Sequence, residues 1–124
     1  MILGTGIDII EIDRIARAIQ KTPSFVERYF SEQERQYFQS RKMRFEVIAG
    51  NFAAKEAFSK ALGTGIRNFA LHEVEILRDS MGKPYINLYG EALKIYKEHN
   101  IQVLHVSISH CKEYAIASVI AEKF

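Results

Sequence analysis

The sequence holds a single cysteine, Cys111, among its 124 residues. One thiol cannot form an internal disulfide, so a disulfide-stapled fold is excluded and a reducing compartment is expected. No apolar run approaches the roughly 18 residues that a membrane-spanning helix needs. The first ten residues carry Asp8 and no basic cluster, which is not the pattern of a signal peptide. We therefore expect a cytoplasmic protein that does not enter a membrane.

The chain also has little net charge, only +2 at neutral pH. That excess is too small to argue for nucleic-acid binding, and no nucleic-acid partner is expected. The positive charge is nevertheless uneven, because basic side chains gather between residues 14 and 28. They are Arg14, Arg17, Lys21 and Arg28, with Glu27 among them. This basic stretch is either a solvated helix surface or a surface that meets an acidic partner.

Repeats, low-complexity segments and linkers are absent, and the length suits one domain over residues 1–124. The predicted strands cover 1–10, 73–79, 84–89, 103–110 and 114–121, the last two as a hairpin. The predicted helices cover 11–21, about 43–62 and 91–100, with two short helices at the Ser-x-x-Glu patterns that begin at Ser24 and Ser31. Strands and helices do not alternate as a doubly wound sheet requires, so we predict an α+β fold.

The long predicted helix divides into two faces when its residues are projected at 100° each. Alanine, phenylalanine and leucine residues form a broad apolar arc. A separate polar stripe is formed by Glu56, Ser59, Lys60 and Gly63. The stripe is either a surface Glu–Lys pair before a glycine cap, or a set of groups offered to a ligand. Because Gly63-Thr64-Gly65 follows a helix, a phosphate held there would need a cation or a nest of N–H groups.

Asp8 lies among isoleucines in the first predicted strand. Simple alternation would turn its isoleucine neighbours to the core and leave Asp8 in solvent. Alternatively, Asp8 is a rigid carboxylate for a metal ion, with Gly4 and Gly6 leaving room for a ligand. Asp8 and Glu56 are too few to cage a metal ion. They would suit Mg²⁺, which keeps several waters and accepts substrate phosphates as ligands.

The strand predicted over 103–110 ends in Ser-Ile-Ser-His. A serine hydrolase is one interpretation, but the Gly-x-Ser-x-Gly motif is absent. A lone histidine at a strand end is usually structural, so His110 gains functional interest only if it faces the same cleft as other polar groups. Adjacent residues of a strand face opposite ways, so we do not expect Cys111 to pair with His110.

Four segments occur in an order and spacing that resembles the holo-acyl-carrier-protein synthases, the small phosphopantetheinyl transferases of bacterial fatty-acid synthesis. They are GIDII around Asp8, FAAKEAFSKALGTGI over 52–66, Gly82-Lys83-Pro84, and VSISH ending at His110. The resemblance covers essentially the whole chain. It implies transfer of the 4'-phosphopantetheine arm of coenzyme A to a serine of an acyl carrier protein, with release of adenosine 3',5'-bisphosphate.

The resemblance also implies roles for single residues. Asp8 and Glu56 would hold Mg²⁺ against the pyrophosphate of coenzyme A. Lys60 would neutralise phosphate oxygens as charge moves toward the leaving group. The same phosphate site would be lined by Ser59, Gly63, Thr64, Gly65 and His110. The general base stays open between Glu56, Asp8 and a water on the metal.

The fold implied is a small antiparallel sheet packed against one long and several short helices. The family forms homotrimers with each active site between two subunits. The residues that would reach from the neighbouring subunit toward the adenosine and its 3'-phosphate are Gly82, Lys83, Pro84 and Arg44, with Arg41 nearby. The acidic carrier protein would dock on Arg14, Arg17, Lys21, Phe25 and Arg28, with Phe25 as an apolar anchor.

The sequence departs from the family pattern at residue 51. The family commonly has Gly-Arg-Phe where this chain has Gly50-Asn51-Phe52, and the usual arginine helps to hold coenzyme A. Asn51 cannot supply that charge, so Arg44 or Lys55 would have to compensate.

Two other functional classes compete with the transferase. A metal-dependent phosphohydrolase would also use Asp8, Glu56 and Lys60, but it usually needs more carboxylates. A non-catalytic module that binds an acidic protein would explain the basic stretch but not these three residues.

Overall fold

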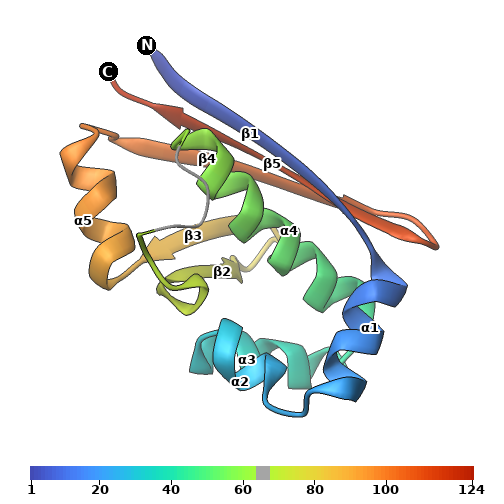
Figure 1. Ribbon diagram of the computed structural model, residues 1–124. Coiled ribbons are helices and arrows are strands. Elements are labelled where there is room, and N and C mark those ends of the chain that lie inside the picture. The colour runs from blue at the N-terminus through green and yellow to red at the C-terminus, as the bar shows by residue number, and fades with distance from the viewer. Residues whose placement is uncertain (64–67) are drawn as a thin grey trace.

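The computed structural model describes residues 1–63 and 68–124, whose strands form two antiparallel sheets (Figure 1). The larger sheet has the order β1-β5-β4, with β1 at Ile2–Glu11, β5 at Tyr114–Glu122 and β4 at Val103–His110. The smaller sheet pairs β2 (Val74–Arg78) with β3 (Pro84–Leu88). The predicted α+β class is confirmed.

The helices cover the segments that the sequence patterns predict. They are α1 (Ile12–Lys21), α2 (Phe25–Tyr29), α3 (Glu32–Ser40), α4 (Phe45–Ala61) and α5 (Gly90–Glu98), with a short 3-10 turn, η1, at Leu71–Glu73. The capping box predicted at Ser31 is present, because its hydroxyl accepts from the Glu34 N–H and the Glu34 carboxylate accepts in return. Ser24 precedes α2 but its side chain makes no capping hydrogen bond, so that capping box is wrong.

Helix α4 crosses the inner face of the larger sheet and packs against β1 and β5 (Figure 1). Its approach to β1 is set by two glycines. A Cβ atom at Gly4 would lie 2.0 Å from the carbonyl oxygen of Ala61, and one at Gly6 would lie 1.9 Å from that of Ala57. A larger residue would overlap helix backbone, which cannot turn aside as a side chain can. Gly4 and Gly6 therefore allow the close packing of α4 against β1. The prediction that they leave room for a ligand is wrong.

The side chains of β1 alternate in the opposite sense to the one expected from simple alternation. Ile7 and Ile9 are 60% and 62% exposed on the outer face of the larger sheet. Asp8 and Ile10 instead turn inward. The strand register places Ile9 beside the half-buried Ile116 of β5 on that outer face. Helix α4 covers only the inner face, so the outer face presents a band of apolar side chains.

A buried ion pair joins α3 to α4. Lys55 Nζ lies 2.7 Å from Glu34 Oε1, and both side chains are fully buried. The ammonium also donates to the carbonyl oxygens of Leu71, at 2.9 Å, and Val74, while Glu34 Oε2 accepts from Asn51 Nδ2 at 3.0 Å. Burial raises the pKa of Glu34 and lowers the pKa of Lys55, and the attraction between them opposes both shifts. Lys55 is therefore neutralised in the core and cannot compensate for Asn51 at a ligand.

One apolar cluster fills the space between the larger sheet, α4 and the short helices. Its large side chains with no exposed surface include Phe30, Phe38, Ile48 and Phe58. Within the described residues, no helix combines the length and apolar character that crossing a bilayer requires.

We predict that Gly6→Ala lowers the free energy of unfolding by about 3 kcal/mol, because a methyl group forced against backbone separates strand and helix. Gly50→Ala is the matched control. Its Cβ would lie 2.9 Å from Cγ2 of Ile108, a side-chain atom that must shift, but alanine is favoured over glycine inside a helix by about 1 kcal/mol. We therefore expect a smaller loss of stability than in Gly6→Ala. Urea unfolding followed by circular dichroism measures both variants. A Gly6→Ala protein as stable as wild type would contradict this account of the packing.

Candidate active site

Asp8 and Lys60 meet where α4 crosses β1. Lys60 Nζ lies 3.0 Å from Asp8 Oδ1 and also donates to the carbonyl oxygen of Ile7 at 3.0 Å. The Asp8 side chain keeps 17% of its surface exposed and that of Lys60 keeps 53%. The two residues are 52 positions apart in the sequence. Their contact therefore depends on the close crossing of helix and strand.

Glu56 lies one turn before Lys60 on α4 and belongs to the same charged group. Burial raises the pKa of the Glu56 carboxyl and the charge of Asp8 raises it further, whereas Lys60 and Arg14 lower it. Two carboxylates that repel each other in this way suit a divalent cation, which would relieve the repulsion. Across residues 1–63 and 68–124, no three His, Cys, Asp or Glu side chains are grouped to hold a metal ion. A metal ion held by Asp8 and Glu56 would thus need ligands from water or substrate.

A pocket of about 410 Å³ opens beside these two carboxylates. It is lined by Asp8, Ile9, Ile10, Arg14, Ile15, Ala18, Phe25, Phe52 and Glu56. Phe25 stacks on Phe52, with 5.9 Å between the ring centroids. Two residues predicted to dock a partner, Arg14 and Phe25, therefore share a pocket with the predicted metal ligands. We call this space the carboxylate pocket.

The other three basic residues predicted for docking lie on the exposed surface outside the carboxylate pocket. Arg17 pairs with Asp13 one turn earlier on α1, with 3.1 Å between Nε and Oδ2. Both side chains are exposed, so this pair adds little stability and leaves Arg17 accessible to a partner. Lys21 ends α1, and Arg28 lies in α2.

A smaller cavity, of about 200 Å³, brings together three of the predicted nucleotide-binding residues. It is lined by Tyr37, Glu46, Val47, Gly50, Arg78, Gly82, Pro84, Ile108 and His110. Successive helix residues turn by about 100°, so Val47 lies about 180° and Gly50 about 120° around α4 from Glu56. Gly82, Pro84 and His110 therefore meet one another but not the carboxylate pocket. We call this space the His110 cavity.

The turn between β2 and β3 presents Gly82 and Pro84 to the His110 cavity. Asp79 Oδ1 accepts from the backbone N–H groups of Met81 and Lys83, at 2.8 and 2.9 Å, and so fixes the turn. Gly82 has a φ of 84°, a left-handed conformation that glycine adopts without steric cost. Lys83 is exposed on this turn, and its side chain does not line the cavity.

Ser59 does not belong to the exposed stripe that the helical projection predicts, and that prediction is wrong. The residue is only 1% exposed, and its hydroxyl donates to the Glu56 carbonyl oxygen at 2.7 Å. Gly63 follows α4 with a φ of 76°, and its N–H donates to the Lys60 carbonyl oxygen at 3.0 Å, as predicted for a glycine at a helix end.

Three further predicted residues lie outside both pockets or outside the described chain. Arg44 is the N-cap residue of α4, with an exposed side chain that lines neither pocket. Thr64 and Gly65 fall in the segment outside the described residues.

Arg78 lines the His110 cavity and is not among the residues predicted from the sequence. Its Nη2 donates to Asn51 Oδ1 at 2.9 Å. The signal that could have found it is its position at the end of a predicted strand, directly before the turn that carries Gly82-Lys83-Pro84.

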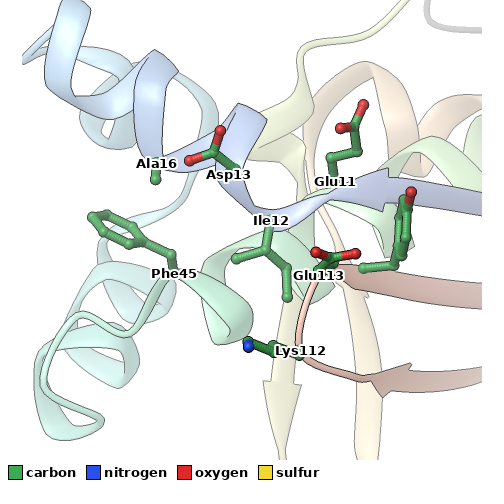
Figure 2. A pocket seen from close by; sticks show the side chains of 8 residues that line it. Glu11, Ile12, Asp13, Ala16, Phe45, Lys112 and Glu113 are labelled. Carbon is green, nitrogen blue, oxygen red and sulfur yellow. The ribbon is translucent and has the colours of Figure 1, made fainter.

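A third pocket, of about 480 Å³, lies between the β1–α1 junction and the β4–β5 hairpin (Figure 2). Figure 2 shows three carboxylates around it, those of Glu11, Asp13 and Glu113, with Lys112 beside them. None of the predicted site residues lines this pocket. Its excess of negative charge makes it unsuited to a nucleotide or a pyrophosphate.

The sequence profile of the 4'-phosphopantetheinyl transferase superfamily matches residues 4–119. The chain is 54% identical, over 121 residues, to the holo-[acyl-carrier-protein] synthase of Alkaliphilus metalliredigens, which covers 98% of this chain and 99% of that protein. The chain belongs to the holo-acyl-carrier-protein synthases of this superfamily. The resemblance found in the four sequence segments is confirmed.

Solved structures of synthases share the fold. The synthase from Neisseria meningitidis matches with a TM-score of 0.92 and 35% identity, over 99% of this chain and 100% of that one. A synthase from Bacillus anthracis, solved in complex with CoA (3',5'-ADP), matches with a TM-score of 0.83 and 41% identity, over 100% and 99% of the two chains.

The charges around Glu56 predict two opposite titration shifts in this synthase. Asp8→Asn should lower the pKa of Glu56, because the charge of Asp8 raises it, and Lys60→Met should raise it, because the charge of Lys60 lowers it. NMR titration of the Glu56 carboxyl carbon, without divalent cations, measures both. Lys94→Met, which removes an exposed charge on α5, is the control and should leave the Glu56 pKa unchanged. Shifts of the same sign would mean that the three groups do not share one site.

Proposed function

We propose that this chain transfers the 4'-phosphopantetheine group from coenzyme A to a serine hydroxyl of an apo acyl carrier protein, releasing adenosine 3',5'-bisphosphate. It would act with Mg²⁺, as one domain over residues 1–124, in the cytoplasm. The observation that carries the proposal is the meeting of Asp8, Glu56 and Lys60 at one crossing of β1 and α4. Family membership over nearly the whole chain supports it, since the relatives are holo-[acyl-carrier-protein] synthases.

Asp8 and Glu56 are the residues that would hold Mg²⁺. They fit this ion because both line one pocket, and because a cation, the Lys60 ammonium, already lies 3.0 Å from Asp8 Oδ1. Two carboxylates leave the remaining positions of an octahedron to water and phosphate oxygens. When bound, the ion supplies charge neutralisation and alignment for the pyrophosphate of coenzyme A.

Lys60 is placed to stabilise the leaving group. Its side chain is more than half exposed, so its flexible stem can carry the ammonium from Asp8 to a phosphate oxygen. When the serine oxygen attacks the β-phosphorus, the bond to the bridging oxygen breaks and negative charge collects on adenosine 3',5'-bisphosphate. A cation at that position lowers the barrier more than it stabilises the bound substrate.

Glu56 lines the pocket in which the carrier serine would lie, and a carboxylate can bind a metal ion through one oxygen while its other oxygen accepts a proton. We propose that Glu56 receives the proton of the carrier serine as that oxygen attacks.

The carrier protein would dock on α1 and α2, beside the carboxylate pocket. Arg14 and Phe25 line that pocket, so a partner held by them reaches Asp8 and Glu56 directly. Acyl carrier proteins are acidic, and a basic surface speeds their encounter and sets their orientation. The outer part of this surface is formed by Arg17, Lys21 and Arg28.

We further propose that the chain forms a homotrimer whose active sites are completed by a neighbour. One supporting observation is the separation of the predicted site residues within one chain. The His110 cavity, with Gly82 and Pro84, lies across α4 from the carboxylate pocket. A site that uses both groups of residues therefore needs a second subunit.

The outer face of the larger sheet is the second observation in favour of a trimer. Ile7 and Ile9 are largely exposed there, and the register continues this apolar band to Ile116 and Ile120 of β5. Apolar surface of this kind on a strand face usually marks an interface, and a cyclic assembly would bury one such face in each subunit.

The transfer itself is tested by the intact mass of an apo acyl carrier protein after incubation with this chain, coenzyme A and Mg²⁺. We predict full conversion by wild type and a rate at least about 100-fold lower for Asp8→Ala and for Glu56→Ala. Glu98→Ala, an exposed carboxylate on α5, is the control and should match wild type. Phosphate release with an unmodified carrier would identify a phosphohydrolase instead. Carrier binding without any product would identify a non-catalytic module.

The shared site is tested by complementation. We predict that Lys60→Ala and His110→Ala chains are each weak alone, and that co-expressed hybrids recover activity. In a random trimer about a quarter of the interfaces pair two intact halves, so recovery toward a quarter of the wild-type rate is expected. A hybrid of Lys60→Ala with Glu56→Ala is the control and should stay weak, because both changes fall on one half. Full activity of a sedimenting monomer would refute the shared site.

A further inference from the structure

Arg78 carries a positive charge into the His110 cavity, where the mechanism above does not use it. It is the last residue of β2 and is half-buried. It lines the cavity together with Gly82, Pro84 and His110. A guanidinium, an imidazole and a tight glycine–proline turn therefore converge on one small space.

Two contacts hold the guanidinium of Arg78 in place. Its Nη2 donates to Asn51 Oδ1 at 2.9 Å, and its Cζ lies 5.1 Å from the centroid of the Tyr37 ring. Asn51 is itself fixed, because its Nδ2 donates to Glu34 Oε2 at 3.0 Å and to the Ile76 carbonyl oxygen at 2.9 Å. The arginine is thus oriented by a buried polar network before any ligand arrives, which is what a precise binding site requires.

The charge of Arg78 has no direct ion-pair partner among the described residues, although the charge of Glu34, beyond Asn51, attracts it. Across residues 1–63 and 68–124, none lies within 4.0 Å of this guanidinium, including Glu46, which also lines the cavity. Its hydrogen bonds to described residues go to Asn51 and, at 3.5 Å, to the Leu77 carbonyl oxygen. Of its five N–H donors, the Nε–H makes no hydrogen bond to a described residue. Burial disfavours the charged form of Arg78 and lowers its pKa more than Glu34 raises it, and an anion in the cavity would relieve that cost.

The chemistry of the cavity favours a phosphate monoester as that anion. The planar fork of an arginine matches two phosphate oxygens at once. A second guanidinium, that of Arg41, lies 5.6 Å from the Tyr37 ring and adds positive charge nearby. The pyrophosphate of coenzyme A is already assigned to Lys60 and the two carboxylates across α4. The phosphate left for this cavity is the one on the ribose.

We propose that Arg78, oriented by Asn51, binds the 3'-phosphate of coenzyme A. This inference rests on the proposed function, which supplies the ligand. It also assigns a role to Asn51, because the side-chain amide of Asn51 accepts from the Arg78 guanidinium, which extends from β2.

The test compares ligands that differ only in the 3'-phosphate. We expect Arg78→Gln to raise the Kd of adenosine 3',5'-bisphosphate, measured by calorimetry, by about tenfold or more. The KM for coenzyme A should rise by a similar factor, whereas the KM for 3'-dephospho-coenzyme A and the kcat should change less than about twofold. Arg78→Lys, which keeps the charge but loses the fork, should fall between wild type and Arg78→Gln.

Arg35→Gln is the matched control. This arginine on α3 also bonds backbone, donating to the Phe30 carbonyl oxygen at 2.8 Å, but it lies outside the His110 cavity. It should leave both KM values unchanged, and thermal unfolding confirms that all variants fold. Equal losses for coenzyme A and its dephospho form, or wild-type affinity in Arg78→Gln, would overturn the proposal. Wild-type transfer to the carrier protein tests the proposed function separately, and the calorimetric comparison stands whether or not transfer occurs.

Discussion

The close contact between α4 and β1 is the constraint on which the active site depends. A Cβ atom at Gly6 would come within 1.9 Å of the Ala57 carbonyl oxygen, so the helix backbone lies directly on the strand. At that separation the Lys60 ammonium reaches Asp8, and the same carboxylate raises the pKa of Glu56. Glycines without any chemistry of their own therefore set the spacing of three charged groups, two of them proposed metal ligands.

A different side of α4 is organised by buried polar groups rather than by close backbone packing. Lys55 and Glu34 neutralise each other in the core, and Glu34 also fixes Asn51. Asn51 in turn holds Arg78 at the His110 cavity. One helix thus presents a carboxylate site on one side and supports a cationic site on the other. This division would let one chain contribute different halves to two active sites of the homotrimer proposed above.

Local patterns predicted most of the architecture, because helix and strand periods and turn residues act over a few positions. The helical period correctly predicted that Glu56 and Lys60 lie on the same face of α4. It predicted wrongly that Ser59 is exposed, because a helical projection gives the direction of a side chain but not the elements that cover it. The Ser59 hydroxyl can be buried because it donates a hydrogen bond to a carbonyl oxygen of its own helix. The orientation of Asp8 was open because α4, far along the chain, decides which face of β1 is covered. The Arg78 contact to residue 51, 27 positions away, has no local signal at all.

The buried ion pair between Lys55 and Glu34 also limits how this sequence can evolve. Losing either partner leaves a lone charge in the core, at a cost of about 3–5 kcal/mol, which is a large share of the 5–15 kcal/mol by which domains are typically stable. Replacing both with apolar residues of similar volume is often close to neutral. The two positions are therefore separated from an apolar alternative by an unstable intermediate. In related chains they should be exchanged together or kept together, so that residues 34 and 55 form a single inherited unit.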